Sequence, residues 1–445
     1  MCLKVIRISL FLIVSFPTFS QINSSDTLHR RVCGSAKMNP AYEVAFQQMM
    51  KKSEQFSRVG NSAIIYNIPV IFHIVHNGEP IGASRNITQA QINSQLVILN
   101  EDFRKMNSNF STWVTQTNFI NAAADCEINF CMAKVDMNNA TLLEPGINRI
   151  DRNTKGWGPP PYQGETFASS YVNSVIKPAS IWDPTKYMNI WILEFAGNTL
   201  GFAQFPTIPS GTTPINDMVG NGGNSNSDGV VIDYKAIGNI GTATSPYNKG
   251  RTLTHEAGHW FGLWHINNDA SCGNDYCNDT PTQYALSGSC PTLGGANVNS
   301  GCTPNTNGKM YQNYMDYSDD KCMAMFTNDQ KARMHAVMAN CINRFSLNSS
   351  TVCSSVGINE NTNMIKYNLY PNPSSDKFNL EVAFNSPEEI MITIENTLGQ
   401  IVKKVNSSQT MEANFNFDLS ECNKGIYFIS IRTKTGISVK RLILQ

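Results

Sequence analysis

The chain of 445 residues has no surplus of charge and, beyond its first residues, no long apolar run. Its 34 acidic and 34 basic side chains cancel, and no basic run or aromatic-basic pattern is present, so the sequence gives no indication of nucleic-acid binding. No later segment is apolar over enough residues to cross a bilayer, so we expect no transmembrane segment in the mature chain. The length is typical of two folded domains with connecting segments.

The amino-terminal end is the one apolar stretch. Residues 1–20 combine a basic start, Lys4 and Arg7, with an apolar run at 8–16 and a small-residue end at 18–20. The run is too short to span a membrane and is typical of a secretory signal peptide. We therefore expect a secreted protein.

Histidine is scarce, yet three of the seven histidines fall in one short segment with the spacing H-E-x-x-H-x-x-G-x-x-H. On a helix, His255 and His259 are one turn apart, so both imidazoles can reach a single ion. Gly262 permits the positive φ that ends a helix and returns His265 to that ion. Three nitrogen ligands leave one position for water, as in a catalytic zinc site, with Glu256 as the base. Histidines that only pack or cap are the alternative, but they leave the five fixed positions unexplained.

A methionine follows the third histidine by about fifty residues, in Tyr314-Met315-Asp316-Tyr317. With this segment the sequence resembles the pappalysin-like (cytophagalysin, ulilysin-type) metzincin metalloproteases. The resemblance implies an α/β (α+β) catalytic domain with a twisted mixed sheet, an active-site helix and an irregular, disulfide-stapled lower subdomain. It also implies that Met315 packs as an apolar side chain beneath the imidazoles. Tyr317 would stabilise the tetrahedral intermediate by hydrogen bonding or act as a removable extra ligand of the metal. Ordinary core side chains are the alternative for both.

Twelve cysteines in a secreted chain predict disulfides, and removing Cys2 with the signal peptide leaves an odd number, eleven. The candidate for a special thiol is Cys33, which follows Arg30 and Arg31 and precedes Gly34. The arginines would favour a thiolate that occupies the open zinc position of a latent form, and this context resembles pappalysin-like propeptides. An ordinary cysteine of a flexible segment is the alternative.

Residues 267–313 lack periodicity and are rich in Asn, Asp, Gly, Pro and Cys, which predicts a long loop that needs staples. The resemblance implies the bridges Cys272–Cys302 and Cys290–Cys322. Cys126 and Cys131 are close enough in sequence to form another. The sequence leaves open the pairing of the others, Cys277, Cys341, Cys353 and Cys422.

The same loop offers hard oxygen ligands at Asp275, Asp279 and the carbonyl of Thr280. The resemblance implies structural calcium near these residues. A solvated acidic turn is the alternative.

Asp320 lies five residues beyond Met315, in the loop that shapes the pocket for the substrate residue after the cleaved bond in metzincins. The resemblance implies a preference for Arg or Lys there, through charge-assisted hydrogen bonds. A surface pair with Asp319 is the alternative. The preference would make Ser57–Arg58 a site of self-cleavage.

Hydrophobic patterns place the remaining elements. A β-branched run predicts a strand at 64–75, and helical spacing with Thr88 as N-cap predicts a helix at 87–99. The segment 200–205 resembles the metzincin edge strand along which an extended substrate lies. Further strands are predicted at 128–135, 188–195 and 229–234, and helices at 41–52 and 329–345.

The last residues alternate strands and turns after a Ser, Asn and Thr-rich linker. Strands are predicted at 377–382, 391–395 and 425–431, in a small, all-β, sandwich-like domain. With Tyr370-Pro371-Asn372-Pro373 and the basic Lys440-Arg441, they resemble sorting domains of the type IX secretion system. The resemblance implies the type IX secretion machinery as a partner, then release or surface attachment. Composition alone also allows an adhesive, carbohydrate-binding or transport role.

These patterns predict a secreted, latent, zinc-dependent endopeptidase that acts on proteins or peptides and carries one catalytic zinc. A differently specialised metallohydrolase, or a surface adhesin or binding module with a structural zinc site, is the alternative. The predicted segments are a signal peptide (1–20), a propeptide with a cysteine switch (21–57), the protease (58–345), a linker (346–365) and the sorting domain (366–445).

Overall fold

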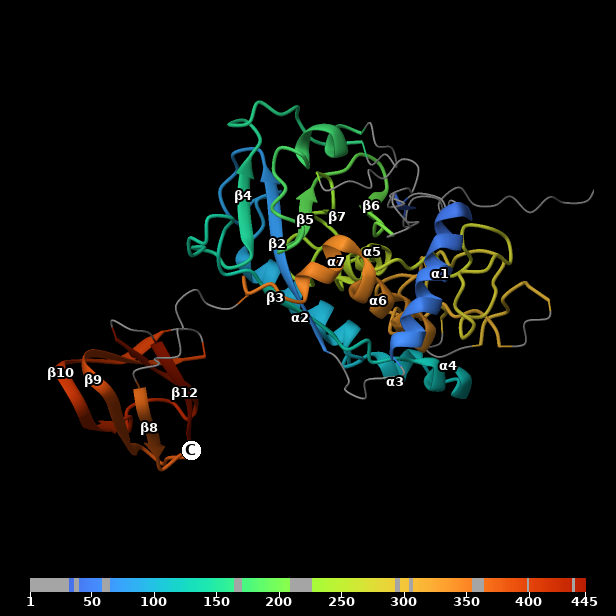
Figure 1. Cartoon of the computed structure of the whole chain (residues 1–445). Helices are drawn as coiled ribbons and strands as arrows, with labels where there is room; N and C mark the ends of the chain where they lie inside the picture. Colours follow the sequence, from blue (N-terminus) through green and yellow to red (C-terminus); the bar gives the residue numbers. More distant parts are fainter. Residues whose placement is uncertain are drawn as a thin grey trace, which may run out of the picture.

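The structure is a computed structural model that describes residues 32–35, 40–57, 65–163, 170–208, 226–292, 297–303, 307–353, 364–397, 400–433 and 437–445. Two separate sheets organise the chain (Figure 1). The predicted signal peptide, Arg30, Arg31 and Arg58 lie outside the described residues.

The first sheet has seven strands, in the order β1-β6-β7-β5-β2-β3, and β4 also pairs with β2. All of its pairings are parallel except that of β6 with β7, which is antiparallel, so the mixed sheet expected from the resemblance is present. β5 and β7 are buried along their whole length, as expected for strands covered on both faces. The strands are β1 (Val32–Cys33), β2 (Tyr66–His76), β3 (Ile128–Met132), β4 (Ile147–Asp151), β5 (Met188–Leu193), β6 (Thr199–Ala203) and β7 (Val230–Asp233).

Helices pack around this sheet, and α2 and α5 contact each other. The Thr88 side chain accepts the backbone N–H of Gln91, which confirms the N-cap of α2. The helices are α1 (Pro40–Ser57), α2 (Gln89–Phe103), α3 (Phe110–Trp113), α4 (Thr117–Ala122), a π-helix (Val172–Ile176), α5 (Arg251–Trp260), α6 (Asn328–Asn340) and α7 (Ile342–Leu347). Among the described residues, no helix is long and apolar enough to cross a membrane.

The main core fixes α5, which carries the histidine motif, to the sheet. Leu253 and Ala257 of α5 are fully buried in one cluster with Ile92 and Leu99 of α2 and with strand side chains such as Ile190. Each fully buried Leu or Ile contributes about 1.5–3 kcal/mol relative to exposure. This apolar packing explains how a short helix of ten residues is held in one position.

Three disulfides are present. Cys272–Cys302 and Cys290–Cys322 staple the long loop after α5, with the pairing that the resemblance implied. The expected bridge between Cys126 and Cys131 is wrong. Cys131, in β3, is bonded to Cys353, whereas Cys126 is a buried free thiol in the main core.

The count of cysteines was a poor guide to free thiols. Five described cysteines are free rather than one: Cys33, Cys126, Cys277, Cys341 and Cys422. Four of these five are buried, where a cysteine behaves as a small apolar side chain. The odd number of cysteines therefore did not distinguish Cys33 from the other free thiols.

The protease part continues beyond the expected end at Phe345. Val352 is buried against Trp182 and Tyr187, and the next residue, Cys353, is tied to β3 by its disulfide. The long-range bond anchors this polar segment, which composition alone identified as linker. The described residues of the protease part thus end at Cys353.

The second sheet has five strands, in the order β10-β9-β11-β12, and β8 pairs with β9. The expected strands 377–382 and 391–395 are one continuous strand, β9, because β10 pairs with both halves of it. β8 pairs with the first half and β11 with the second, so the long strands join two parts of a sandwich-like domain around one core. The strands are β8 (Met364–Tyr370), β9 (Lys377–Asn396), β10 (Ile401–Asp418), β11 (Gly425–Arg432) and β12 (Ile437–Leu444).

Candidate metal centre

The three histidines of the motif converge as their spacing predicts. His255 and His259 lie on α5, with ring centroids 4.8 Å apart. Gly262 has φ +86°, the left-handed conformation that favours glycine, and it ends the helical path. The His265 ring then lies 4.6 Å from the His259 ring and 5.2 Å from the His255 ring.

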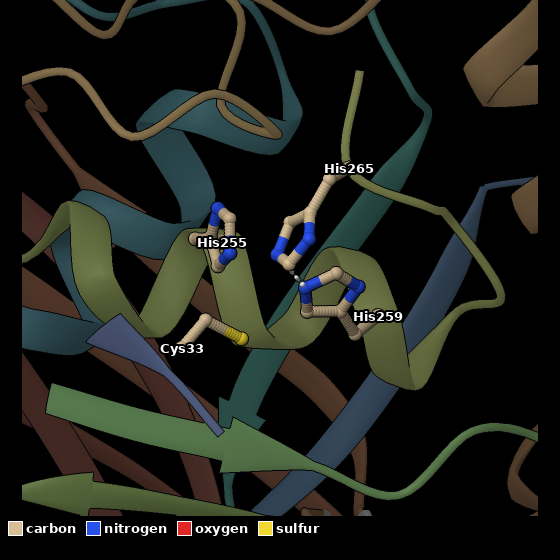
Figure 2. A group of neighbouring side chains, drawn as sticks. All are labelled: Cys33, His255, His259 and His265. Atoms are coloured by element: carbon tan, nitrogen blue, oxygen red, sulfur yellow. Dashed lines mark hydrogen bonds between the residues drawn. The ribbon is translucent and has the colours of Figure 1, made fainter. Parts of the chain in front are cut away.

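Cys33 completes the cluster from a segment more than two hundred residues away. One ligand atom from each of Cys33, His255, His259 and His265 lies within 4.8 Å of the others, and all four residues are buried. Figure 2 shows the side chains converging from β1, from α5 and from the segment after α5. Three imidazoles and one thiol form a donor set typical of zinc.

The Nδ1 atom of each histidine is already engaged. His255 Nδ1 lies 2.7 Å from the Tyr314 carbonyl oxygen, and His259 Nδ1 lies 2.7 Å from the Leu263 carbonyl oxygen. His265 Nδ1 lies 2.7 Å from Asp269 Oδ1. With Nδ1–H donating to oxygen, the lone pair of each Nε2 is left to bind a metal. Burial lowers the pKa of His259 to about 3, which keeps its imidazole neutral as a ligand must be.

Asp269 was missed by the sequence analysis. It lies four residues after His265 in a turn, with φ +53°, and nothing in its local sequence distinguishes it from the other acidic residues of the loop. Only the folded turn shows that its carboxylate orients His265, a candidate metal ligand. Carboxylate partners of ligating histidines fix the ring and raise its basicity.

The segment that carries Cys33 lies along the edge of the sheet. β1 pairs in parallel with β6, and the Gly34 N–H donates to the Gly201 carbonyl oxygen at 2.9 Å. A Cβ atom at Gly201 would lie 2.7 Å from the Val231 carbonyl oxygen and 3.0 Å from Glu256 Cγ, so this strand position accepts no side chain. The expected edge strand is thus present and is covered by the residues around Cys33.

Glu256 is buried beside the same segment. Its Oε2 accepts a hydrogen bond from Ser35 Oγ at 3.2 Å, and Cys33 Sγ lies 3.5 Å from the same oxygen. The Ser35 hydroxyl also accepts the Ala203 N–H at 3.2 Å. Ser35, a residue without any sequence signal, therefore engages the expected base while Cys33 approaches the histidines.

The environment of Cys33 differs from the expectation for its thiolate. Burial raises the pKa of Cys33 well above its usual range, and the negative charge of Glu256 raises it further. The arginines expected to favour the thiolate lie outside the described residues. A thiolate at Cys33 would need a cation held by the three histidines, since a bound metal ion would favour deprotonation of a coordinating thiol.

Met315 and Tyr317 both lie close to the histidine motif. A Cβ at Gly258, between the two helical histidines, would lie 2.4 Å from Met315 Sδ, so the methionine packs directly beneath the motif. The Tyr317 ring lies 4.8 Å from the His265 ring and 5.8 Å from the His255 ring. Burial raises the pKa of Tyr317 well above its usual range, which keeps the hydroxyl protonated.

A buried network joins α2 to the metal centre and was also missed. Asp102 of α2 accepts hydrogen bonds from Thr254 Oγ1 at 2.7 Å and from Tyr314 Oη at 2.8 Å, and it pairs with Arg251 at 3.0 Å. Since the Tyr314 carbonyl holds His255, one carboxylate connects α5 to the turn beneath it. Burial raises the pKa of Asp102 to about 6.

Asp320 is fully buried, so it is not part of a surface pair with Asp319. Its Oδ2 accepts the N–H groups of Lys249 and Arg251 at 2.9 and 3.2 Å, where a carboxylate stabilises the start of α5. A cavity of about 220 Å³ lies nearby, and its lining includes Leu200 of β6 and Pro246. Asp320 itself does not line this cavity. Its N–H donates to the Pro246 carbonyl oxygen, which places it behind the wall.

The candidate calcium ligands lie together in the loop after α5. Asp275 Oδ1 accepts hydrogen bonds from Thr280 Oγ1 and the Cys277 N–H, and Asp279 Oδ2 accepts the Asp329 N–H. Among the described residues, no donor reaches the buried Oδ2 of Asp275 or Oδ1 of Asp279. Burial raises the pKa of Asp275 to about 7.

Two family matches cover much of the chain. Residues 170–339 match the family described as Pregnancy-associated plasma protein-A, and residues 368–445 match the Secretion system C-terminal sorting domain. The first contains the whole histidine motif and the Met315 turn.

Relatives and solved structures agree with these matches. An extracellular metalloprotease of Sordaria macrospora is 41% identical over 150 residues, which cover 34% of this chain and 47% of that protein, so the chain spans about half the length of this relative. One of Colletotrichum graminicola is 28% identical over 318 residues, covering 70% of this chain and 92% of its own. Mature mirolysin of Tannerella forsythia, solved with a cleaved peptide, is 33% identical with a TM-score of 0.52 and covers 65% of this chain and 98% of its own. A promirolysin mutant of the same organism is 33% identical with a TM-score of 0.51, and it covers 68% of this chain and 91% of its own.

Proposed function

The chain belongs to the pappalysin-like family of metzincin zinc metalloproteases, and from this premise we propose that it is a secreted, latent endopeptidase. One observation carries the proposal. The Nε2 faces of His255, His259 and His265 and the Cys33 thiol surround one point, and the carboxylate of Glu256 lies beside it. Three of these ligands belong to the protease fold, whereas Cys33 belongs to a segment that maturation can remove.

Zinc in this site would lower the pKa of a bound water to about 7 and polarise the scissile carbonyl. After Cys33 and Ser35 leave, Glu256 accepts a proton from the attacking water and returns it to the leaving amine. The protonated hydroxyl of Tyr317 donates a hydrogen bond to the developing oxyanion. The edge of β6, no longer paired with β1, binds the substrate backbone in an extended conformation.

The experiment that tests this function is peptide cleavage by the mature form. Glu256→Ala should lose at least about 100-fold in kcat and keep its zinc, because general acid-base catalysis contributes about 10²–10⁴-fold. Glu101→Ala, on α2, serves as the matched control. A chelator should abolish cleavage by the parent. Wild-type cleavage by Glu256→Ala would refute the base assignment, and no cleavage by the parent would favour the adhesin with a structural zinc site.

We propose that the sorting domain directs the chain to the type IX secretion machinery, in keeping with its family match. The proposed segments are a signal peptide at 1–20, a propeptide that contains Cys33, and self-cleavage near Arg58. Amino-terminal sequencing of the mature enzyme tests the cleavage site, and a start far from Arg58 contradicts it.

We also propose a preference for Arg or Lys in the residue after the cleaved bond. Leu200 lines the cavity, and the next residue, Gly201, lies against Glu256. The buried Asp320 lies behind Pro246, which also lines the cavity. Asp320→Asn removes the charge but keeps an acceptor for the start of α5. Digestion of a peptide library should show that Asp320→Asn loses the preference while Asp319→Asn keeps it. An unchanged preference in Asp320→Asn would count against the pocket.

Structural calcium at Asp275, Asp279 and the Thr280 carbonyl completes the proposal. Its support is the pair of buried carboxylate oxygens without a donor among the described residues, since calcium binds oxygen ligands of this kind. Melting temperatures before and after exhaustive dialysis against a calcium-selective chelator test the site. An unchanged melting temperature rejects it.

A further inference from the structure

Helix α1 lies against the segment that joins His259 to His265, where Phe46 approaches Gly262 and packs in one cluster with Trp264. Its apolar face consists of Tyr42, Phe46 and Met49, which recur at helical spacing. All three are buried, with exposed fractions of 0%, 0% and 5%. They pack in one cluster with Phe205, Trp264, Val337 and Cys341 of the protease. We call these four residues together with Arg333 the α1 groove.

A buried ion pair fixes the helix in the groove. Glu43 receives two hydrogen bonds from the Arg333 guanidinium, at 2.8 and 3.0 Å, and a third from Trp264 Nε1 at 2.7 Å. Glu43 is 2% exposed and Arg333 is 1% exposed. The paired geometry is the strong form of a charge-assisted hydrogen bond, and it specifies a carboxylate at this position.

The groove and the metal centre share one short segment. Arg333 Nη2 also donates to the Gly262 carbonyl oxygen, and a Cβ at Gly262 would lie 2.8 Å from the Phe46 ring. Phe205 stacks on Trp264 at 4.6 Å and lies 5.3 Å from the His259 ring. Gly262 therefore admits both the return of His265 and the close approach of α1.

The amino-terminal segment contacts the protease at two separable places. Residues 33–35 reach the histidines and Glu256, whereas α1 supplies no atom to the candidate metal cluster. If the helix leaves, the guanidinium of Arg333 loses the carboxylate of Glu43, and the apolar side chains of the groove lose their cover. A groove that presents both a guanidinium and apolar side chains favours an amphipathic helix with a carboxylate on its apolar face.

We propose that the α1 groove is a binding site of the mature protease for the helix of residues 40–57 as a separate chain. The proposal rests on the proposed function, because it requires a propeptide that maturation detaches from the protease. The excised helix then binds beside the metal centre without occupying it. The longer segment that includes Cys33 and Ser35 occupies both sites.

A synthetic peptide of residues 40–57, added to the mature enzyme, tests this surface by calorimetry and by the fluorescence of the protein. We expect saturable binding, at least 10-fold weaker binding of the Glu43→Gln and Phe46→Ala peptides, and no change for Val44→Ala, whose side chain is 59% exposed. All variants are in the peptide, so the protease fold is not at risk. Absence of binding, or equal binding of the Glu43→Gln peptide, would overturn the proposal.

Cleavage of a reporter peptide in the same samples separates this proposal from the proposed function. The 40–57 peptide should leave most cleavage intact, a 32–57 peptide should inhibit, and excess 40–57 should weaken that inhibition by competition. Failure of the shorter peptide to compete counts against the shared groove. Absence of cleavage without any peptide contradicts the proposed function, while the binding measurement still decides the groove.

Discussion

The orientation of His265 by Asp269 leads to a direct test of the metal centre. The acceptors that hold His255 and His259 are backbone carbonyls, of Tyr314 and Leu263, which no substitution removes. Asp269 is the exception, because its side chain accepts from His265 Nδ1 at 2.7 Å. Asp269→Ala therefore deletes one orienting contact and leaves all three ligands in the chain.

The expected size of the effect follows from the type of contact. Loss of an orienting partner costs about 10–100-fold in metal affinity, which corresponds to about 1.4–2.7 kcal/mol. Asp269→Asn keeps an acceptor but loses the charge, so we expect an intermediate loss. Asp183→Ala, in a loop away from the centre, is the matched control and should bind zinc as the parent does.

Competition of the mature enzyme with a chromophoric chelator measures the zinc affinity, and thermal unfolding of the metal-free forms separates it from folding. The expected order of affinity is parent, Asp269→Asn, Asp269→Ala, with similar stabilities of the metal-free forms. Parent-like affinity in Asp269→Ala would show that the hydrogen bond does not orient the ligand. A fall in affinity fully accounted for by lower stability of the metal-free protein would contradict the reasoning as well.

Three further predictions address latency and stability. Cys33→Ala should make the precursor prematurely active or degraded in a reporter assay, and Cys33→Ala with Ser35→Ala should be more active still, because Glu256 is then released; equal latency of all forms would remove the switch. Burial raises the pKa of Asp275 from 3.8 to about 7, so the folded chain holds this proton more tightly than the unfolded chain. In calcium-free buffer the free energy of unfolding should therefore fall by at most about 4 kcal/mol as pH rises from about 4 to about 7. Denaturant titrations should show a smaller fall for Asp275→Asn. Removing the Cys131–Cys353 bridge, whose cysteines are 222 residues apart, should lower the free energy of unfolding by up to about 5 kcal/mol; an unchanged denaturation midpoint would contradict the loop-entropy estimate.

Much of the fold could be predicted from the sequence because its signals are local. The strand β2, the helix α2 with its Thr88 cap, and the zinc helix α5 follow the periods of their own residues. The single long strand β9 was predicted as two because its middle residues are polar, and only its pairing with β10 shows that the strand continues. Cys353 was assigned to the linker because its tie to Cys131 lies 222 residues away in sequence.

The candidate site likewise has a part that local sequence predicts and a part that only the fold assembles. The spacing of His255, His259 and His265 predicts that the three imidazoles converge, because one helical turn and one glycine set their positions. These positions depend only on residues within the motif. Resemblance then supplied Met315 and Tyr317, which the structure places beneath and beside the imidazoles.

The tertiary structure alone decided what surrounds that point. Asp102 and Asp269 orient the site, Ser35 engages Glu256, and Glu43 pairs with Arg333 from a sequence separation of 290 residues. None of these residues has a local pattern, since a lone carboxylate or hydroxyl gains its role only from the partner that folding brings within hydrogen-bond distance. The sequence by itself thus predicted the candidate metal ligands and the reaction class, because their signals are local, and the packing of distant segments decided which side chains orient and cover the histidine cluster.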